Sequence, residues 1–346
     1  MTQLKSLVAA AVALPLSALA QYAPSGGSSV QIYGRLDASV NAVHIDDVGT
    51  RKTVATDTSL IGFRGSEDLG GGLTAFFKLE SQLDVGTGSP NAAQFWNREA
   101  MVGLNHPQFG QVDLGTHWVP TIWLTVRSDP FGRAQMGGLF TLLQGVGARG
   151  TSVQFINSVQ YATPRVDGFI GRVVVQAPEG ALNKNYAGLV EYFGDRLYAG
   201  TTYESVQTNT AAAALGVAPT TRSATLGLGV TYRFDAVKLF GYAQTNKISG
   251  LQNVAGYNLG VTVPVGLGEF RVSAAHTNNP GKEASLYAVG YAYFLSKRTQ
   301  VYTSAARLNN SAGSRFAIWP ASQDGAVPSA PGQDSSGIQV GMRHTF

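Results

Sequence analysis

Apolar and polar residues alternate one by one over many segments of this chain. In the last ten residues, one parity holds Ile338, Val340, Met342, His344 and Phe346, and the other holds Gln339, Arg343 and Thr345. A strand sends alternate side chains to opposite faces, so this segment predicts a strand with one apolar and one polar face. The chain closes on an aromatic residue, as the sealing strand of a membrane β-barrel does, although a soluble sandwich would alternate in the same way.

The same period of two recurs along the chain, in residues 30–41, 73–80, 224–234 and 270–274. Helices would repeat every 3.6 residues, so these segments predict strands and the chain reads as all-β. The strands are joined by short, turn-like connections at residues 69–72, 105–110, 164–168, 193–196, 234–237, 264–268 and 295–298. Longer polar segments lie between them, near 44–57, 85–94, 118–150, 177–184, 207–222, 246–252, 277–284 and 309–335.

Strict alternation of seven short and eight long connections gives 16 antiparallel strands. An even number of strands places both termini on one side, with short turns in the periplasm and long loops outside. Nothing in the sequence marks a second domain, so residues 21–346 are predicted to form a single transmembrane barrel.

Residues 1–20 have the features of a cleavable secretory signal peptide. Lys5 supplies the positive charge, residues 7–14 form the apolar region, and residues 18–20 form a small-x-small cleavage site. An N-terminal membrane anchor is the alternative, but the apolar stretch is short and is interrupted by Pro15 and Ser17. The mature chain is therefore expected to begin at Gln21 and to be exported from a Gram-negative cytoplasm.

Composition narrows the class further. There is no cysteine, so an exported chain of this size has no disulfides. Charged residues make up 13%, about half the share usual in soluble domains. After the signal no run of about 18 apolar residues occurs, so membrane-spanning helices are excluded. The net charge of +4, without a cluster of Lys and Arg, does not suggest nucleic-acid binding.

Five blocks, in this order, resemble the general diffusion porins of β-proteobacteria: residues 30–37, 62–73, 157–164, 295–299 and 341–346. The resemblance covers almost the whole mature chain. It implies an outer-membrane homotrimer of 16-stranded barrels, surrounded by lipid and lipopolysaccharide and needing no cofactor. Each barrel would hold a water-filled channel for passive diffusion of small hydrophilic solutes and ions, narrowed by an inward-folded third extracellular loop.

Residues 118–150 are the predicted constriction loop. Loops of this length are usually functional or disordered, and the apolar residues between Trp118 and Leu143 argue against disorder. Residues 129–132 (Asp-Pro-Phe-Gly) resemble the tip of the family's constriction loop. An external lid or a loop that contacts another subunit remains the alternative.

Charged residues at the constriction would set selectivity. Strand parity places five of them on the lumen face: Arg35, Asp37, Arg64, Lys78 and Glu80. Glu80 and Arg98 also match an acidic and a basic position of the family, and Arg127, Asp129 and Arg133 lie in the loop. Arg98 shares its parity with apolar residues, so a bulge or a position near the rim is needed. Each of these charges could instead be a solvated wall residue without a role in selectivity.

The chain departs from the family at three basic positions, where it has Leu60, Thr116 and Gln154. The anion selectivity common in the family is therefore in doubt, and a weak anion preference is expected. A channel selective for organic acids or other small anions is the alternative.

An enzyme is not expected. The five histidines are scattered, and His44 with Asp46 and Asp47 is the only candidate for hydrolytic chemistry. Gly-rich residues 226–229 lie inside an alternating strand, not in a phosphate-binding turn. An adhesin or purely structural barrel would not need a constriction loop of this length.

Overall fold

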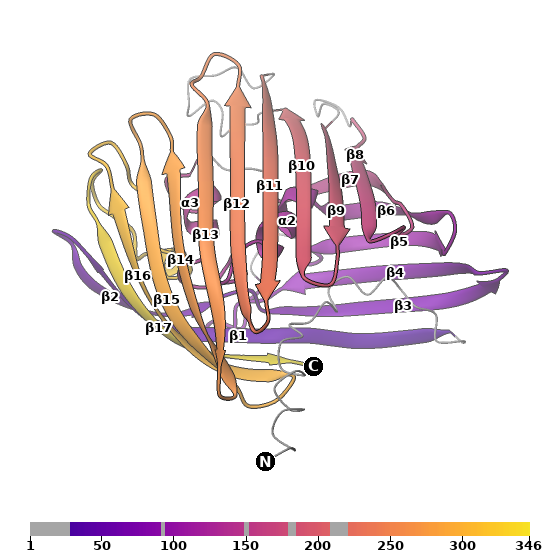
Figure 1. The fold of residues 1–346 in the computed structure, drawn as a ribbon, viewed down its shortest axis with the longest axis horizontal. Helices are drawn as coiled ribbons and strands as arrows, with labels where there is room; N and C mark the ends of the chain where they lie inside the picture. Colours follow the sequence, from indigo (N-terminus) through magenta and orange to yellow (C-terminus); the bar gives the residue numbers. More distant parts are fainter. Residues whose placement is uncertain (1–27, 91–93, 149–151, 179–184, 208–220) are drawn as a thin grey trace.

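The computed structural model describes residues 28–90, 94–148, 152–178, 185–207 and 221–346, and the predicted signal peptide lies outside them. Antiparallel strands dominate, and no described helix is long and apolar enough to cross a membrane (Figure 1). The elements are β1 (Ser29–Ile45), β2 (Gly49–Thr56), β3 (Leu60–Gly70), β4 (Leu73–Gln82), β5 (Glu99–His106), β6 (Gly110–Trp118), α2 (Pro120–Arg127), α3 (Phe140–Leu143), β7 (Gln154–Ala162), β8 (Phe169–Gln176), β9 (Asn185–Phe193), β10 (Leu197–Gln207), β11 (Arg222–Phe234), β12 (Val237–Ile248), β13 (Val254–Val265), β14 (Gly268–Asn278), β15 (Ala284–Phe294), β16 (Thr299–Asn310), η2 (Ala321–Asp324) and β17 (Ser335–Thr345).

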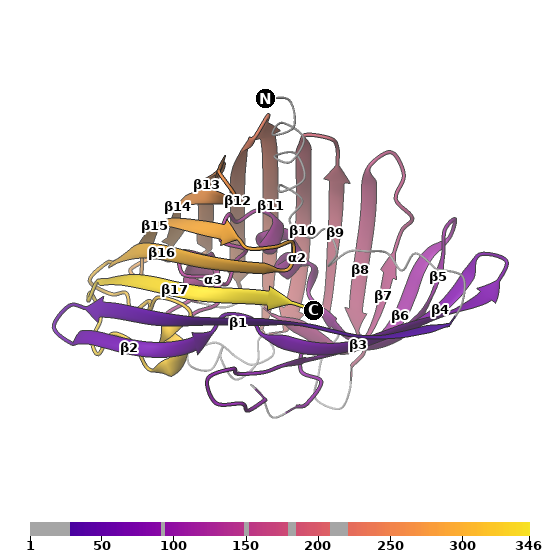
Figure 2. The ribbon, with the colours of Figure 1, turned by 90° about the horizontal axis from the view of Figure 1, so that it is seen from below.

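The first and last strands close the sheet into a barrel. β1 and β17 pair in antiparallel register from Arg35 with Thr345 to Ile45 with Ser335, and they lie side by side in Figure 2. Beyond β17, the backbone N–H of Phe346 donates to the carbonyl of Gly34 at 3.0 Å, and the reverse bond is 3.1 Å. The C-terminal residue thus completes the seam, as the terminal alternation predicts.

β2 and β3 form one interrupted strand. β2 pairs with residues 38–45 of β1, and β3 pairs with residues 29–35 of the same strand. Residues 57–59 separate them, and Ser59 Oγ accepts the backbone N–H of Asp37 at 2.8 Å. Counting the pair as one span gives 16 spanning strands, so the predicted 16-stranded antiparallel barrel is confirmed.

The prediction of a long first loop over residues 44–57 was wrong. Residues 49–56 form β2, and only residues 46–48 connect it to β1. At about 3.3 Å per residue, the 17 residues of β1 exceed the ~25 Å apolar band of such barrels even when tilted. The ends of this hairpin therefore carry polar residues, because they extend beyond the membrane.

Exposure follows the predicted parity. On β11, Leu226, Leu228 and Val230 are 46%, 54% and 43% exposed, whereas Thr225 and Thr231, on the opposite parity at either end of this stretch, are buried. The outer face is thus apolar, and the polar face points into the barrel. Because the membrane solvates the outer face, exposed apolar side chains are stable there.

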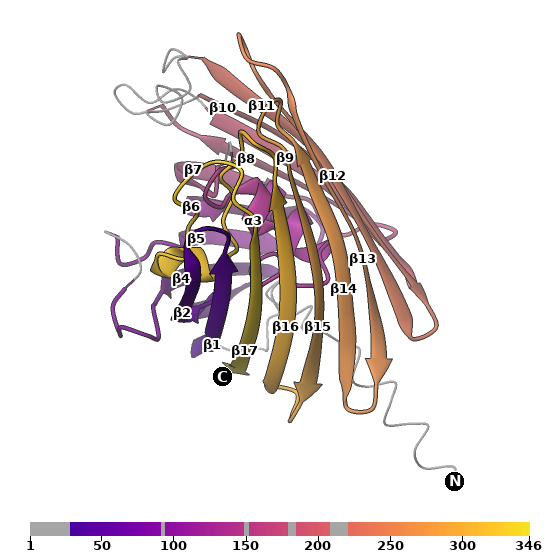
Figure 3. The same ribbon diagram turned by 90° about the vertical axis from the view of Figure 1, so that its left-hand side faces the viewer.

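Two connections pack inside the barrel. The third loop, residues 119–148, contains α2, which contacts β9, β10 and β11, and α3, which contacts β14. Figure 3 shows α3 between the strands that begin the chain and those of its second half. The connection from β16 to β17, residues 311–334, buries Phe316 and Ile318 in the same apolar cluster as Leu139 and Leu142 of the third loop. The main hydrophobic core therefore lies between these loops and the inner wall.

Candidate functional site

The lumen faces of β10 and β11 carry glycines where α2 packs against the wall. A Cβ atom at Gly200 would lie 2.8 Å from Leu124 Cδ1, and one at Gly229 would lie 2.7 Å from the same atom. At Gly229 the Cβ would also lie 2.2 Å from Ser128 Oγ. Leu124 is fully buried, so a larger residue at either wall position would collide with α2.

The same arrangement continues along the wall to β13 and β15. A Cβ at Gly260 would lie 2.6 Å from Pro130 Cγ, and one at Gly290 would lie 2.9 Å from Phe131 Cε1. Phe131 is 2% exposed. We call these wall positions the glycine seat: Gly200, Gly229, Gly260 and Gly290. Their missing side chains leave the space that the third loop fills.

Hydrogen bonds fix the remainder of the third loop to the wall. Residues 135–137 are bonded to β14 and β17 through three contacts: Arg271 Nη1 to Gln135 Oε1 at 2.8 Å, the N–H of Met136 to Gln339 Oε1 at 3.1 Å, and Ser273 Oγ to the carbonyl of Gly137 at 3.2 Å. The loop is therefore held by polar as well as apolar contacts, in keeping with its high burial.

Asp129 organises the tip of the loop. Its Oδ1 accepts the N–H of Phe131 at 2.8 Å, and its Oδ2 accepts the N–H of Leu139 at 2.6 Å. Burial raises the pKa of the Asp129 carboxyl to about 6, and the N–H donors of Leu139 and Phe131 act in the opposite direction. Asp129 is 3% exposed, so the structure places it inside the loop fold.

The two loop arginines are also engaged. Arg127 Nη1 donates to Glu191 Oε1 at 2.6 Å, and its guanidinium lies 5.6 Å from the centre of the Trp123 ring. Arg133 lies 4.8 Å from the centre of the Phe140 ring, and burial lowers its pKa to about 10. Both side chains are therefore held against the protein.

On β1, the two predicted lumen charges, Arg35 and Asp37, lie in different environments. Arg35 donates twice to the carbonyl of Thr58, at 3.0 and 3.2 Å. Asp37 is fully buried and accepts from Arg343 Nε at 2.6 Å. The acid is thus neutralised by an arginine of β17, whereas Arg35 is held by a neutral backbone group.

Sequence reasoning missed a second acid beside Asp37. Asp57 lies between β2 and β3, and Tyr302 Oη contacts carboxylate oxygens of both acids. Gln339 Nε2 also donates to Asp57, at 3.2 Å to each carboxylate oxygen. Arg343 is the cation of this cluster, and it pairs with Asp37. Asp57 falls in the segment that the sequence suggested was a loop, so strand parity could not be applied to it.

A second cluster of charges joins β4 to β5. Lys78 Nζ lies 3.0 Å from Glu80 Oε1 and also contacts Glu99. Glu80 accepts from Tyr33 Oη at 2.8 Å and from Arg98 Nε at 3.3 Å. Sequence reasoning missed Glu99, which shares its parity with Met101 and pairs directly with Glu80 across the strands. The cluster has two acids and two bases and is therefore neutral.

Arg98 reaches this cluster because it precedes β5. Its side chain contacts Glu80, and its guanidinium lies 4.8 Å from the centre of the Trp118 ring. The parity conflict in the sequence disappears, because strand alternation begins only at Glu99. Arg64 contacts this cluster through Tyr33. Its guanidinium lies 4.8 Å from the centre of the Tyr33 ring, and the Tyr33 hydroxyl binds Glu80.

Arg172 on β8 is a further lumen-face cation that sequence reasoning missed. It shares its parity with the buried Ile170 and Val174. Its Nε is buried without a hydrogen-bond partner, and in the described parts of the chain it forms no ion pair within 4.0 Å. Glu191, a neighbouring acid, is already bonded to Arg127. Arg172 is therefore a lumen-face cation without an ion-pair partner in the described residues.

Comparison with known proteins identifies the family of this chain. The Gram-negative porin family matches residues 7–313. Outer membrane porin protein 32 of Delftia acidovorans is 32% identical over 364 residues, covering 99% of each chain. This chain belongs to the Gram-negative porin family. A porin of Bordetella pertussis is 26% identical over 99% of this chain and 100% of its own. The structure of an anion-selective porin from Comamonas acidovorans covers 92% of this chain and 100% of its own, at 30% identity and a TM-score of 0.79.

Family membership confirms the resemblance seen in the sequence. The protein is an outer-membrane porin of a Gram-negative bacterium, a water-filled channel for passive diffusion of small hydrophilic solutes and ions. The porin is not an enzyme. In the described residues, no group of three or more His, Cys, Asp or Glu side chains is placed to hold a metal ion.

The candidate for hydrolytic chemistry is not assembled in this porin. His44 Nε2 lies 3.9 Å from Asp46, and both side chains are about half exposed at the barrel rim. A different group of side chains lies inside the wall. His117 Nε2 is 2.5 Å from Asp113 Oδ1, and His117 Nδ1 is 2.7 Å from Ser158 Oγ. However, Ser158 Oγ also lies 2.9 Å from two backbone carbonyls, so its single hydrogen is engaged there. These contacts orient His117, and the Ser158 hydroxyl is not available as a nucleophile.

The three departures from the family occupy different places in this porin. Leu60 is buried and pairs with Arg35 across the strands. Gln154 donates to the carbonyl of Arg98 at 2.8 Å, and thereby fixes the backbone that carries this arginine. Thr116 pairs with β5 near the bulge that ends β6.

Proposed function

We propose that the third loop, predicted as residues 118–150, forms the constriction of this porin. Solutes then pass between the loop and the lumen face of β1–β8. The glycine seat is the observation that carries this proposal, because it fits the loop to the opposite wall, β10–β15. The wall that remains facing the loop holds the predicted charges Arg35, Lys78, Glu80 and Arg98.

The charges along this path support a weak preference for anions. Lys78 and Arg98 pair with Glu80 and Glu99, and Arg343 pairs with Asp37. Three of the lumen-face cations named above, Arg35, Arg64 and Arg172, form no ion pair within 4.0 Å in the part of the chain that the structure describes. They outnumber Asp57, the one described acid of these two clusters that lacks an ion pair. The anion selectivity named for the related Comamonas porin supports the same direction.

Planar-bilayer recording of the refolded porin tests this proposal. Stepwise conductance is expected, with permeability falling steeply for larger ions because the loop occupies part of the lumen. The selectivity should weaken at high ionic strength, since salt screens the wall charges over about 10 Å at 0.1 M and 3 Å at 1 M. Equal permeability for small and large organic ions would contradict the constriction.

We further propose that the porin assembles as a homotrimer in outer-membrane lipid and lipopolysaccharide and that cleavage after Ala20 precedes assembly. Its family supports the trimer. The positive charge, the apolar region and the small-x-small site of residues 1–20 support the cleavage. Mass spectrometry of the protein from outer membranes checks both. The denatured subunit should begin at Gln21, and the native complex in mild detergent should have three times the subunit mass. A monomeric mass would contradict the trimer.

A further inference from the structure

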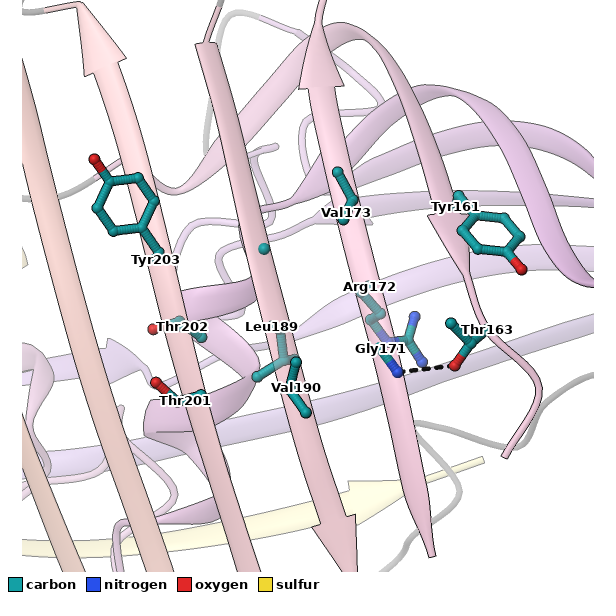
Figure 4. Close-up of a pocket in the computed structure, with 11 residues that line it drawn as sticks. Tyr161, Thr163, Gly171, Arg172, Val173, Leu189, Val190, Thr201, Thr202 and Tyr203 are labelled. Carbon is teal, nitrogen blue, oxygen red and sulfur yellow. Dashed lines mark hydrogen bonds between the residues drawn. The ribbon is translucent and has the colours of Figure 1, made fainter. Parts of the chain in front are cut away.

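The outer face of the barrel has a hollow of about 350 Å³ over β7, β8, β9 and β10. Two outward-facing glycines create it. Gly188 lies in the cross-strand row between Val173 of β8 and Tyr203 of β10, and Gly171 lies in the next row beside Val190. Figure 4 shows Tyr161 and Tyr203 on the two sides of the hollow, with Gly171, Val173 and Val190 between them.

Two threonine hydroxyls that line the hollow are already used in hydrogen bonds within the wall. The N–H of Gly171 donates to Thr163 Oγ1 at 2.9 Å, and Thr201 Oγ1 donates to the carbonyl of Gly227 at 3.2 Å. Apart from these two threonines, the outward side chains around it are apolar or aromatic; Val173 and Val190 are 52% and 51% exposed. A polar or charged ligand would lose its hydration there without gaining hydrogen bonds.

Aromatic pairs mark both ends of the hollow. Phe169 and Tyr192 stack with centroids 4.9 Å apart at the end near the short turns. Tyr186 and Tyr203, 6.3 Å apart, lie at the other end. Aromatic girdles of such barrels sit at the membrane interface, so the hollow begins at the periplasmic interface and extends into the apolar band.

We propose that this hollow binds one acyl chain of a membrane phospholipid. The outer face of a porin is surrounded by hydrocarbon, and an unfilled apolar void forfeits dispersion contacts. At ~30 Å³ for a group the size of a water molecule, the hollow holds about a dozen methylene groups. That is the greater part of one fatty acyl chain, whereas a flat barrel surface contacts such a chain on one side only.

Photo-labelling of the reconstituted porin tests this site. The probe is phosphatidylethanolamine with a diazirine on one acyl chain, and labelled peptides are mapped by mass spectrometry. Label per exposed residue is expected to be severalfold higher at Val173, Val190 and Tyr203 than on the outer face of β11. Gly188→Leu fills the hollow and should remove this excess, while label on β11 and single-channel conductance stay unchanged.

Three outcomes would overturn the site. One is equal label on both surfaces, and another is an excess that survives Gly188→Leu. The third is label lower than on β11 together with disulfide-linked dimers of a Val190→Cys variant, which would show that a second copy of the chain covers the hollow. If the leucine variant fails to fold, Gly171→Ala is the substitute, because its Cβ would lie 3.4 Å from the nearest atom, a methyl of Thr163.

Discussion

Gly229→Val is expected to displace the third loop and to raise the single-channel conductance of this porin. A Cβ at this position would lie 2.2 Å from Ser128 Oγ and 2.7 Å from the buried Leu124 Cδ1. Overpacking of this kind costs about 1–3 kcal/mol, which the molecule relieves by moving the less constrained partner. The wall is fixed by strand pairing on both sides of β11, so the loop is the part that moves.

The matched control is Gly188→Val, on the outer face. A Cβ there would lie 3.6 Å from the nearest atom, the carbonyl oxygen of Arg172, so the barrel and the loop should both be undisturbed. Conductance of the control should equal that of the wild type. A folded Gly229→Val barrel with unchanged conductance would show that the loop does not limit ion flow.

Arg172→Gln is expected to lower the permeability of anions relative to cations. A unit charge ~4 Å from an ion contributes on the order of 1–4 kcal/mol, depending on the local dielectric, so losing it can change permeability about tenfold. Arg98→Ala should act in the same direction, because Glu80 would keep only Lys78 as its basic partner. Leu60→Arg should act in the opposite direction, since it places a second cation beside Arg35.

Reversal potentials across a salt gradient measure these shifts. Lys247→Gln is the control, because it removes the same charge from an exposed position on the outer face of β12. Its reversal potential should match that of the wild type. If Arg172→Gln also matched the wild type, the selectivity would have to be assigned to other residues of the wall.

Most strands of the barrel could be predicted from the alternation of apolar and polar residues in the sequence. Alternation in the last ten residues gave the closing strand, and alternation in residues 224–234 gave the outer face of β11. The same alternation left Gly227 and Gly229 as unexplained members of the polar face. These two glycines leave room for Leu124, which lies about a hundred positions earlier in the chain. No local sequence pattern predicts such a contact between the wall and the loop.

The charged residues were harder to place for similar reasons. Parity located Lys78 and Glu80 but not Glu99, which shares the inward-facing parity of β5 with Met101. Arg172 lies in a run of apolar residues, because the inner face of β8 also carries the buried Ile170 and Val174 and its outer face meets lipid. Asp57 lies where a strand is interrupted, and an interruption resets the alternation on which the prediction depends.

The seam between β1 and β17 has a consequence for how the barrel forms. Most neighbouring strands are consecutive hairpins, which need only short chain closures, but the seam joins Arg35 to Thr345. Closing so long a segment costs more chain entropy than any hairpin, and contacts of high sequence separation slow folding. The seam also supplies Gln339, which bonds the third loop. The hairpins are therefore expected to form first, and the channel acquires its final width only when the two ends of the chain have met.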